Sequence, residues 1–137
     1  MSKIFLDTNI LVYTVDRNDK KKLSQSRKIL ENAIAKDKPV ISTQVLQEFY
    51  SATTTKLKLD KIIAKNIIHN FRNMEIVQVD LGIIEQGIDI SLLFQISFWD
   101  SLIIAAAEHA NCEMIYTEDL NDTQTIRGIK IVNPFKS

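Results

Sequence analysis

Short apolar runs alternate along this chain with longer segments in which apolar residues recur every three or four positions. The short runs have the character of buried strands, and they fall at residues 4–6, 40–41, 76–79, 113–116 and 129–132. The longer segments have the period of amphipathic helices, and they fall at residues 10–15, 20–37, 45–50, 60–72, 81–95 and 99–107. Strands that alternate with helices predict an α/β sandwich, in which helices flank a central, mostly parallel sheet of four or five strands.

The composition indicates one compact domain over residues 1–137. Hydrophobic residues make up 45% of the chain, and 3 Gly and 2 Pro leave little room for a flexible linker. The single cysteine, Cys112, is typical of a reducing cytoplasm, and we expect it to be a small buried apolar residue. The run Ile4–Leu6 is too short for a signal peptide, and no run approaches the roughly 20 apolar residues of a membrane span. We therefore expect a cytoplasmic protein with no membrane partner.

The charge balance argues against binding of nucleic acid by overall charge. Lys and Arg total 17, as do Asp and Glu, so the net charge is zero, whereas such proteins are usually basic. The run Lys20–Lys22 is a candidate local patch, and a solvated helix start is the alternative. His69 and His109 lack metal-ligand spacing, so we expect both to be structural. The sequence contains no Gly-rich phosphate loop and no nucleophile elbow.

Four acidic residues follow the predicted elements in a way that brings them to one edge of the sheet. Asp7 directly follows the first strand, and Asp119 lies just beyond the fourth. Glu48 lies in the helix after the second strand, and Asp100 lies at the start of a helix, where backbone N–H groups stabilise a carboxylate. Ligands of open α/β sheets gather at the carboxyl ends of the strands. Clustered carboxylates repel one another by roughly 1–4 kcal/mol per close pair, and Mg²⁺ or Mn²⁺, which prefer oxygen ligands, would remove that repulsion.

Each acid also has a simpler interpretation when it is taken alone. Asp7 and Asp100 could each cap the helix that they precede or open. Glu48 could be a solvated helix residue, and Asp119 could belong to a polar turn. The four acids together are better explained by a common metal site than by four separate local roles.

Four segments of the chain follow the order of a known set of motifs. They are Ile4–Leu11, Gln44–Phe49, Phe98–Ala107 and Tyr116–Leu120, with Ile131–Phe135 at the end. The set resembles the motifs of PIN-domain ribonucleases, the fold of VapC-type toxins, and it spans nearly the whole chain. The resemblance implies a PIN-like three-layer sandwich.

The same resemblance implies roles for particular side chains. It implies a Mg²⁺ or Mn²⁺ site held by Asp7, Glu48, Asp100 and Asp119. In the hydrolysis that we expect there, Asp7 and Asp100 would bind the metal directly, and Glu48 and Asp119 would orient water or complete a second metal shell. The matching positions that usually hydrogen-bond the acids or waters are Thr8, Asn9, Ser101 and Thr117. The fourth motif offers three acids, namely Glu118, Asp119 and Asp122. We choose Asp119, with Glu118 as a supporting residue or a solvated neighbour. The family often has a glycine in this loop where the chain has Thr123.

The implied function is metal-dependent hydrolysis of RNA phosphodiester bonds. For the toxin group the resemblance also implies neutralisation by a small antitoxin that inserts into the site, and often a homodimer. Apolar residues in the helices at 20–37 and 60–72 would supply surface for such a dimer.

Three other classes of protein share parts of this pattern. A haloacid-dehalogenase-type phosphatase has a second Asp two positions after the first, where this chain has Asn9. A receiver domain has a phospho-acceptor Asp that ends the third strand, and Asp80 fits that position poorly. A PIN-fold protein that binds nucleic acid without catalysis remains the third alternative, and the complete acidic set argues against it.

Overall fold

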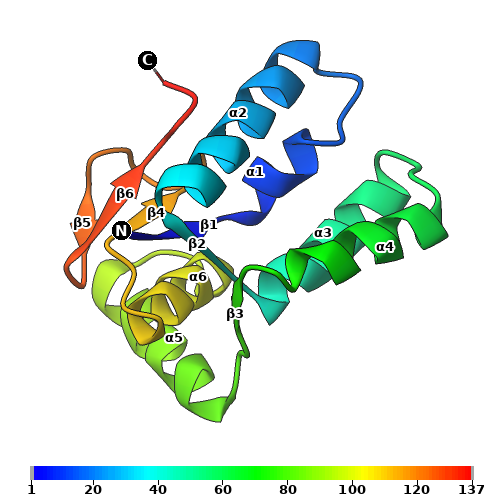
Figure 1. Cartoon of the computed structure of the whole chain (residues 1–137). Helices are drawn as coiled ribbons and strands as arrows, with labels where there is room; N and C mark the ends of the chain where they lie inside the picture. Colours follow the sequence, from blue (N-terminus) through cyan, green and yellow to red (C-terminus); the bar gives the residue numbers. More distant parts are fainter. Residues whose placement is uncertain (1, 137) are drawn as a thin grey trace.

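The computed structural model describes residues 2–136 as an α/β fold around one sheet (Figure 1). Its six strands have the order β3-β2-β1-β4-β6-β5. The strands are β1 (Lys3–Leu6), β2 (Lys38–Ser42), β3 (Glu75–Val77), β4 (Met114–Tyr116), β5 (Thr125–Ile126) and β6 (Ile129–Val132). All neighbouring strands pair in parallel except β5, which runs antiparallel to β6. The mostly parallel sheet is therefore confirmed, and it has one strand more than the sequence pattern predicted.

The extra strand forms a hairpin with a two-residue turn. Ile126 pairs with Ile129, and the turn residues Arg127 and Gly128 have φ angles of 53° and 78°. Positive φ at both central residues is the signature of a type I′ turn, whose twist matches that of paired strands. The dipeptide Arg-Gly between two isoleucines was the signal in the sequence that could have predicted this hairpin.

Helices cover both faces of the sheet and extend beyond one edge. They are α1 (Thr8–Tyr13), α2 (Lys20–Lys36), α3 (Thr43–Thr55), α4 (Lys61–Phe71), α5 (Leu81–Phe94) and α6 (Phe98–His109). In Figure 1, α1 and α2 lie above the sheet, α5 and α6 lie below it, and the pair α3 and α4 projects to the right. The three layers expected for the fold are thus present.

Helix α6 forms the lower wall of the core. It contacts β2, β4 and β6, and its residues from Ser101 to Ala107 are all buried. Helix α5 packs closely on the outer side of α6 at Gly87. A Cβ atom added at this residue would lie only 2.9 Å from Leu102 Cδ2. Cys112 is buried in the same core, as the sequence predicts.

The helix caps explain where several helices begin. The side chains of Ser42, Asp60 and Asp80 accept hydrogen bonds from backbone N–H groups in the first turns of α3, α4 and α5. Such caps each contribute about 1 kcal/mol. His69 and His109 both lie in the last turns of their helices, where a cation is favoured by the helix dipole.

Within residues 2–136, no single helix is long and apolar enough to cross a membrane. Helices α5 and α6 reach the required length and composition only as a pair bent by 119°.

Candidate active site

Asp7 lies at the junction between β1 and α1 and is nearly enclosed by protein. Its side chain is 7% exposed. Oδ1 accepts a hydrogen bond of 2.7 Å from Thr8 N, and Oδ2 accepts one of 2.7 Å from Thr117 Oγ1. Burial nevertheless raises the pKa of Asp7 to about 6, although these two hydrogen bonds oppose the rise, and the charges of Asp119 and Glu48 raise it further. Asp7 caps α1, so the capping interpretation is confirmed, and the same side chain also lines the pocket described below.

Glu48 lies in α3 and is held by residues of two elements. Its Oε1 accepts a hydrogen bond of 2.6 Å from Thr8 Oγ1, which joins the end of β1 to α3. Its Oε2 accepts one of 3.4 Å from Gln44 Nε2, one helical turn earlier. The carboxylate is partly buried, so Glu48 is held by these contacts in addition to facing the solvent of the pocket.

Asp100 lies in the first turn of α6 but does not cap it. The N-cap is Ser97, whose Oγ accepts a hydrogen bond of 3.1 Å from Asp100 N. Within residues 2–136, no donor forms a hydrogen bond with the Asp100 carboxylate. The capping interpretation of Asp100 is therefore wrong, and its charge is available at the positive end of the helix.

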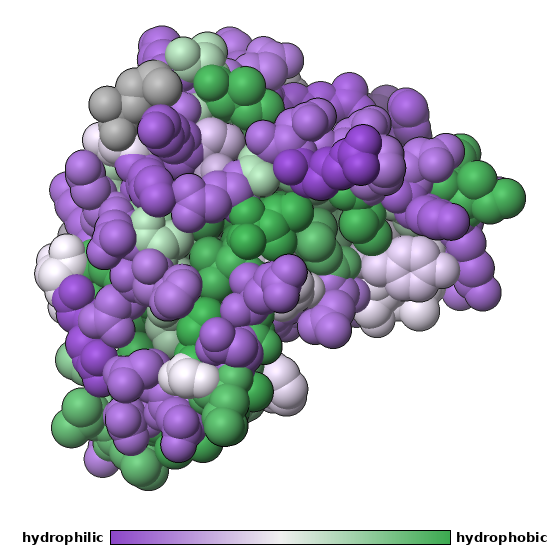
Figure 2. Space-filling model, turned by 60° about the horizontal axis from the view of Figure 1, so that its bottom comes forward, coloured by the Kyte–Doolittle hydropathy of each residue, from purple (hydrophilic) through white to green (hydrophobic). Residues whose placement is uncertain are grey.

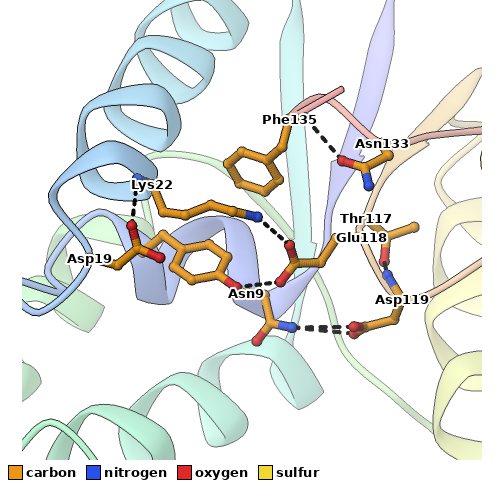
Figure 3. A network of polar contacts seen from close by, with 9 residues as sticks. Asn9, Asp19, Lys22, Thr117, Glu118, Asp119, Asn133 and Phe135 are labelled. Atoms are coloured by element: carbon orange, nitrogen blue, oxygen red, sulfur yellow. Dashed lines mark hydrogen bonds and ion pairs between the residues drawn. The ribbon is translucent and has the colours of Figure 1, made fainter. Parts of the chain in front are cut away.

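Of the three acids in the fourth motif, one reaches the other carboxylates. Asp119 accepts hydrogen bonds from Asn9 Nδ2, the shorter at 3.3 Å, and its backbone N donates to Thr117 Oγ1 at 3.1 Å (Figure 3). Glu118 instead pairs with Lys22, whose Nζ lies 2.6 Å from Glu118 Oε2.

The third acid, Asp122, has a local structural role. Its Oδ1 accepts a hydrogen bond of 2.7 Å from Asn133 N. Asp119 thus lines the pocket described below, whereas Glu118 and Asp122 lie outside it.

The four acids line one open pocket at the carboxyl edge of the sheet, with a volume of about 330 Å³. It is lined by Asp7, Thr8, Asn9, Gln44, Glu48, Ser51, Ala52, Thr55, Lys56, Trp99, Asp100, Ile103 and Asp119. Burial raises the pKa of Asp119, and the charges of Asp100, Glu118 and Glu48 raise it further. The carboxylates therefore repel one another across the pocket, as expected for a site that attracts a cation.

The donors fit a hard cation by chemistry, although the side chains do not converge on one point. No group of three or more His, Cys, Asp or Glu side chains among residues 2–136 is close enough to hold a metal ion in this conformation. Mg²⁺ usually keeps several of its waters and takes only one or two carboxylates directly. An open pocket lined by carboxylates suits a cation that is held partly through water.

The supporting residues divide into two groups. Thr8, Asn9 and Thr117 donate hydrogen bonds to Glu48, Asp119 and Asp7, respectively. Ser101 forms no side-chain hydrogen bond with an acid in the part of the chain that the structure describes. Its hydroxyl donates to the carbonyl oxygen of Ser97 at 2.8 Å, one turn back in the same helix. This is a common way for a buried serine in a helix to satisfy its hydroxyl.

Two pocket residues, one in α3 and one at its C-cap, had no role assigned from the sequence. Gln44 is buried, and its Nε2 also donates to the carbonyl oxygen of Trp99 at 3.1 Å, which ties α3 to the start of α6. Lys56 supplies a positive charge among the residues that line the pocket. Gln44 lies one turn before Glu48 and Lys56 two turns after it, so the helical period was the signal that could have found them.

The fold and the pocket together define an α/β domain with an acidic site at the carboxyl edge of a parallel sheet. The model of the PIN domain family matches residues 4–125, so the chain belongs to the PIN domain family. No curated protein matches the sequence of this chain.

Several solved structures share the fold at low sequence identity. A toxin-antitoxin complex from Klebsiella pneumoniae is 19% identical with a TM-score of 0.71, over 96% of this chain and 98% of that chain. VapBC2 from Rickettsia felis, bound to a DNA fragment from its promoter, is 18% identical with a TM-score of 0.67, over 94% and 96% of the two chains. VapC20 of Mycobacterium tuberculosis, a toxin that cleaves the sarcin-ricin loop, is 17% identical with a TM-score of 0.64, over 85% and 89%.

Proposed function

We propose that this chain is a Mg²⁺- or Mn²⁺-dependent endoribonuclease and the toxin of a type II toxin-antitoxin module. The observation that carries the proposal is the pocket itself, in which acids from four separate parts of the chain face one space. Membership of the PIN domain family supports it. The similar folds of VapBC complexes and of a toxin that cleaves the sarcin-ricin loop give further support.

The proposed roles follow from how each acid is held. Asp7 and Asp100 would bind the cation, because Asp7 is fixed by two hydrogen bonds and Asp100 is free of protein donors. Glu48 and Asp119 would orient the attacking water, or complete the second shell, through the contacts that Thr8 and Asn9 make with them. The cation, when bound, lowers the pKa of its water and offsets charge on the phosphoryl group.

The proposed partner is a small antitoxin protein. Structures of similar fold were solved as toxin-antitoxin complexes. A pocket lined by acids would favour a basic side chain from such a partner, which would compete with the cation for the carboxylates. We also propose a homodimer, as the family resemblance implies.

The function is tested by cleavage of single-stranded and structured RNA with the purified chain. We expect cleavage with Mg²⁺ or Mn²⁺ and its loss in EDTA. Asp7→Asn protein purified in the same way is the control for contaminating nucleases. Equal cleavage by wild type in chelator, or by this variant, would contradict the proposal. RNA binding without cleavage would favour the alternative of a non-catalytic PIN-fold protein.

A further inference from the structure

Glu118 is held on the opposite side of its loop from Asp119. It lies between α1, α2 and the C-terminal segment, outside the pocket. Its Oε2 accepts from Lys22 Nζ at 2.6 Å, and its Oε1 accepts from the hydroxyl of Tyr13 (Figure 3). Both oxygens of Glu118 are therefore occupied by donors from helices that precede it by about a hundred positions.

Aromatic rings shield this contact from solvent. The Lys22 ammonium lies 4.0 Å from the centre of the Phe135 ring and 4.9 Å from that of Tyr13. The two rings meet edge to face at 5.4 Å. The Lys22 and Glu118 side chains are only 26% and 19% exposed. A shielded ion pair with a hydroxyl donor and ring contacts is stronger than an exposed surface pair.

The residues next to Glu118 are also fixed, so the loop has few ways to turn. Thr117 N donates to the carbonyl oxygen of Val132 at 3.0 Å, and Asp119 N donates to Thr117 Oγ1 at 3.1 Å. With Thr117 fixed to the sheet and Glu118 held outward, the Asp119 carboxylate is directed into the pocket beside Asn9. Loss of the outward contacts would let the loop rotate and bring Glu118 toward the same acids.

We propose that Tyr13, Lys22 and Glu118 form a positioning cluster that directs Asp119 into the site. The effect of this cluster on catalysis rests on the proposed function, whereas the cluster itself rests on the hydrogen bonds and ring contacts described above. It also assigns Lys22 a role other than binding RNA, whereas Lys20 and Lys21 are exposed and form no ion pair within residues 2–136. The Lys20–Lys22 run is therefore not one uniform basic patch.

The first test is made on the metal-free protein. The side-chain amide signal of Asn9 in NMR spectra reports its contact with Asp119. We expect this signal to move in Lys22→Met and Glu118→Ala, and to stay in place in Lys21→Met, the matched control. Glu118→Gln should move it less than Glu118→Ala, because the amide oxygen can still accept from Tyr13. An unmoved Asn9 signal in Lys22→Met would overturn the proposal, regardless of whether the protein binds a metal ion.

The second test measures Mn²⁺ binding by quenching of Trp99, the single tryptophan of the chain, which lines the pocket. We expect Lys22→Met to weaken Mn²⁺ binding by about 10-fold, the usual effect of removing a residue that orients a ligand, and Lys21→Met to leave it unchanged. Equal affinity of the two variants would overturn the positioning role. A raised KM for RNA at unchanged Mn²⁺ affinity would instead assign Lys22 to RNA contact. Wild type that binds no Mn²⁺ would contradict the proposed function, and the Asn9 signal would still decide the cluster.

Discussion

The hydroxyl of Thr117 donates a hydrogen bond of 2.7 Å to Asp7, although the two residues are 110 positions apart in the chain. Strands β1 and β4 are parallel neighbours, with Leu6 paired to Tyr116, so the residues that follow them meet at the same edge. This contact fixes the orientation of the most buried acid in the pocket. It also links the first motif to the fourth.

Asp100→Asn is expected to abolish metal-dependent RNA cleavage without lowering stability. Ser97, not Asp100, caps α6, so the substitution removes charge from the pocket and leaves the cap in place. The matched variant Ser97→Ala should lower the free energy of unfolding by about 1 kcal/mol and should still cleave RNA well below its melting temperature. Both are measured by thermal melting and by an RNA cleavage assay. Near-normal cleavage by a folded Asp100→Asn variant would remove Asp100 from the site.

The metal-free protein is expected to gain stability as the pH falls toward the pKa of Asp7. That pKa is about 6 in the folded state and 3.8 in the reference state. Above about pH 6 the buried charge destabilises the fold, by up to about 3 kcal/mol. As the pH falls through this value, the folded state takes up a proton before the unfolded state does, so the free energy of unfolding rises.

Asp7→Asn should therefore be more stable than wild type at neutral pH and should lose this part of the pH dependence. Asparagine also retains the cap of α1. Urea unfolding in EDTA at several pH values measures the effect, with the exposed Asp89→Asn as control. A wild-type protein that becomes less stable between about pH 7 and pH 5, with Asp7→Asn following the same curve, would contradict the buried-charge argument.

Lys56→Met is expected to weaken RNA binding while the catalytic step is preserved. Lys56 lines the pocket at the end of α3, where it can offset a substrate phosphate next to the acids. We expect a higher KM at similar kcat, and a salt dependence of binding that is reduced by about one phosphate contact. Lys65→Met, exposed on α4 and outside the pocket, is the control. If the two variants bind RNA equally well at every salt concentration, Lys56 does not contact the substrate.

Thr123→Gly is expected to stabilise the protein. Thr123 has a φ angle of 68°, and a β-branched residue in this left-handed region costs about 1–2 kcal/mol. Glycine removes that cost, although it increases the entropy of the unfolded chain, so we expect a net gain of about 0.5–1 kcal/mol. Thr125→Gly, in the regular strand β5, should do the opposite. A lower melting temperature for Thr123→Gly would show that its side chain contributes more than the strain costs.

The proposed homodimer is expected to use the exposed apolar face of α5. Leu81, Ile88, Leu92, Leu93 and Phe94 are exposed there, whereas α4 exposes Ile62 and Ile63, and α2 exposes Ile34. Figure 2 turns the lower part of the molecule in Figure 1, where α5 lies, toward the viewer, and hydrophobic side chains are gathered on this face. We therefore expect the dimer interface on α5 and not on the helices at 20–37 and 60–72.

Light scattering of Leu92→Glu/Leu93→Glu should show a monomer, while Ile62→Glu stays dimeric. The reverse pattern would return the interface to the helix at 60–72. A wild-type protein that stays monomeric across micromolar concentrations would contradict the proposed homodimer, whichever helix forms its interface.

The order of strands and helices and the acidic composition of the pocket followed from the sequence alone. Apolar periodicity is a local property, and a carboxylate directly after a parallel strand must lie at the carboxyl edge of the sheet. Strand β5, and with it the hairpin that it forms with β6, was not predicted, because a two-residue strand carries almost no periodic signal.

Only the tertiary structure decided which residues of each motif face the pocket. Glu118 and Asp119 are adjacent and chemically alike, and local sequence gives no reason to direct one inward and the other outward. Their separation depends on Tyr13 and Lys22, which reach Glu118 only when α1 and α2 lie over the sheet. The same holds for Asp100 and Ser97, since both can cap a helix and the choice depends on where α6 begins against the core. Contacts between segments that are distant in the sequence therefore decide which of two chemically similar residues faces the pocket or caps the helix.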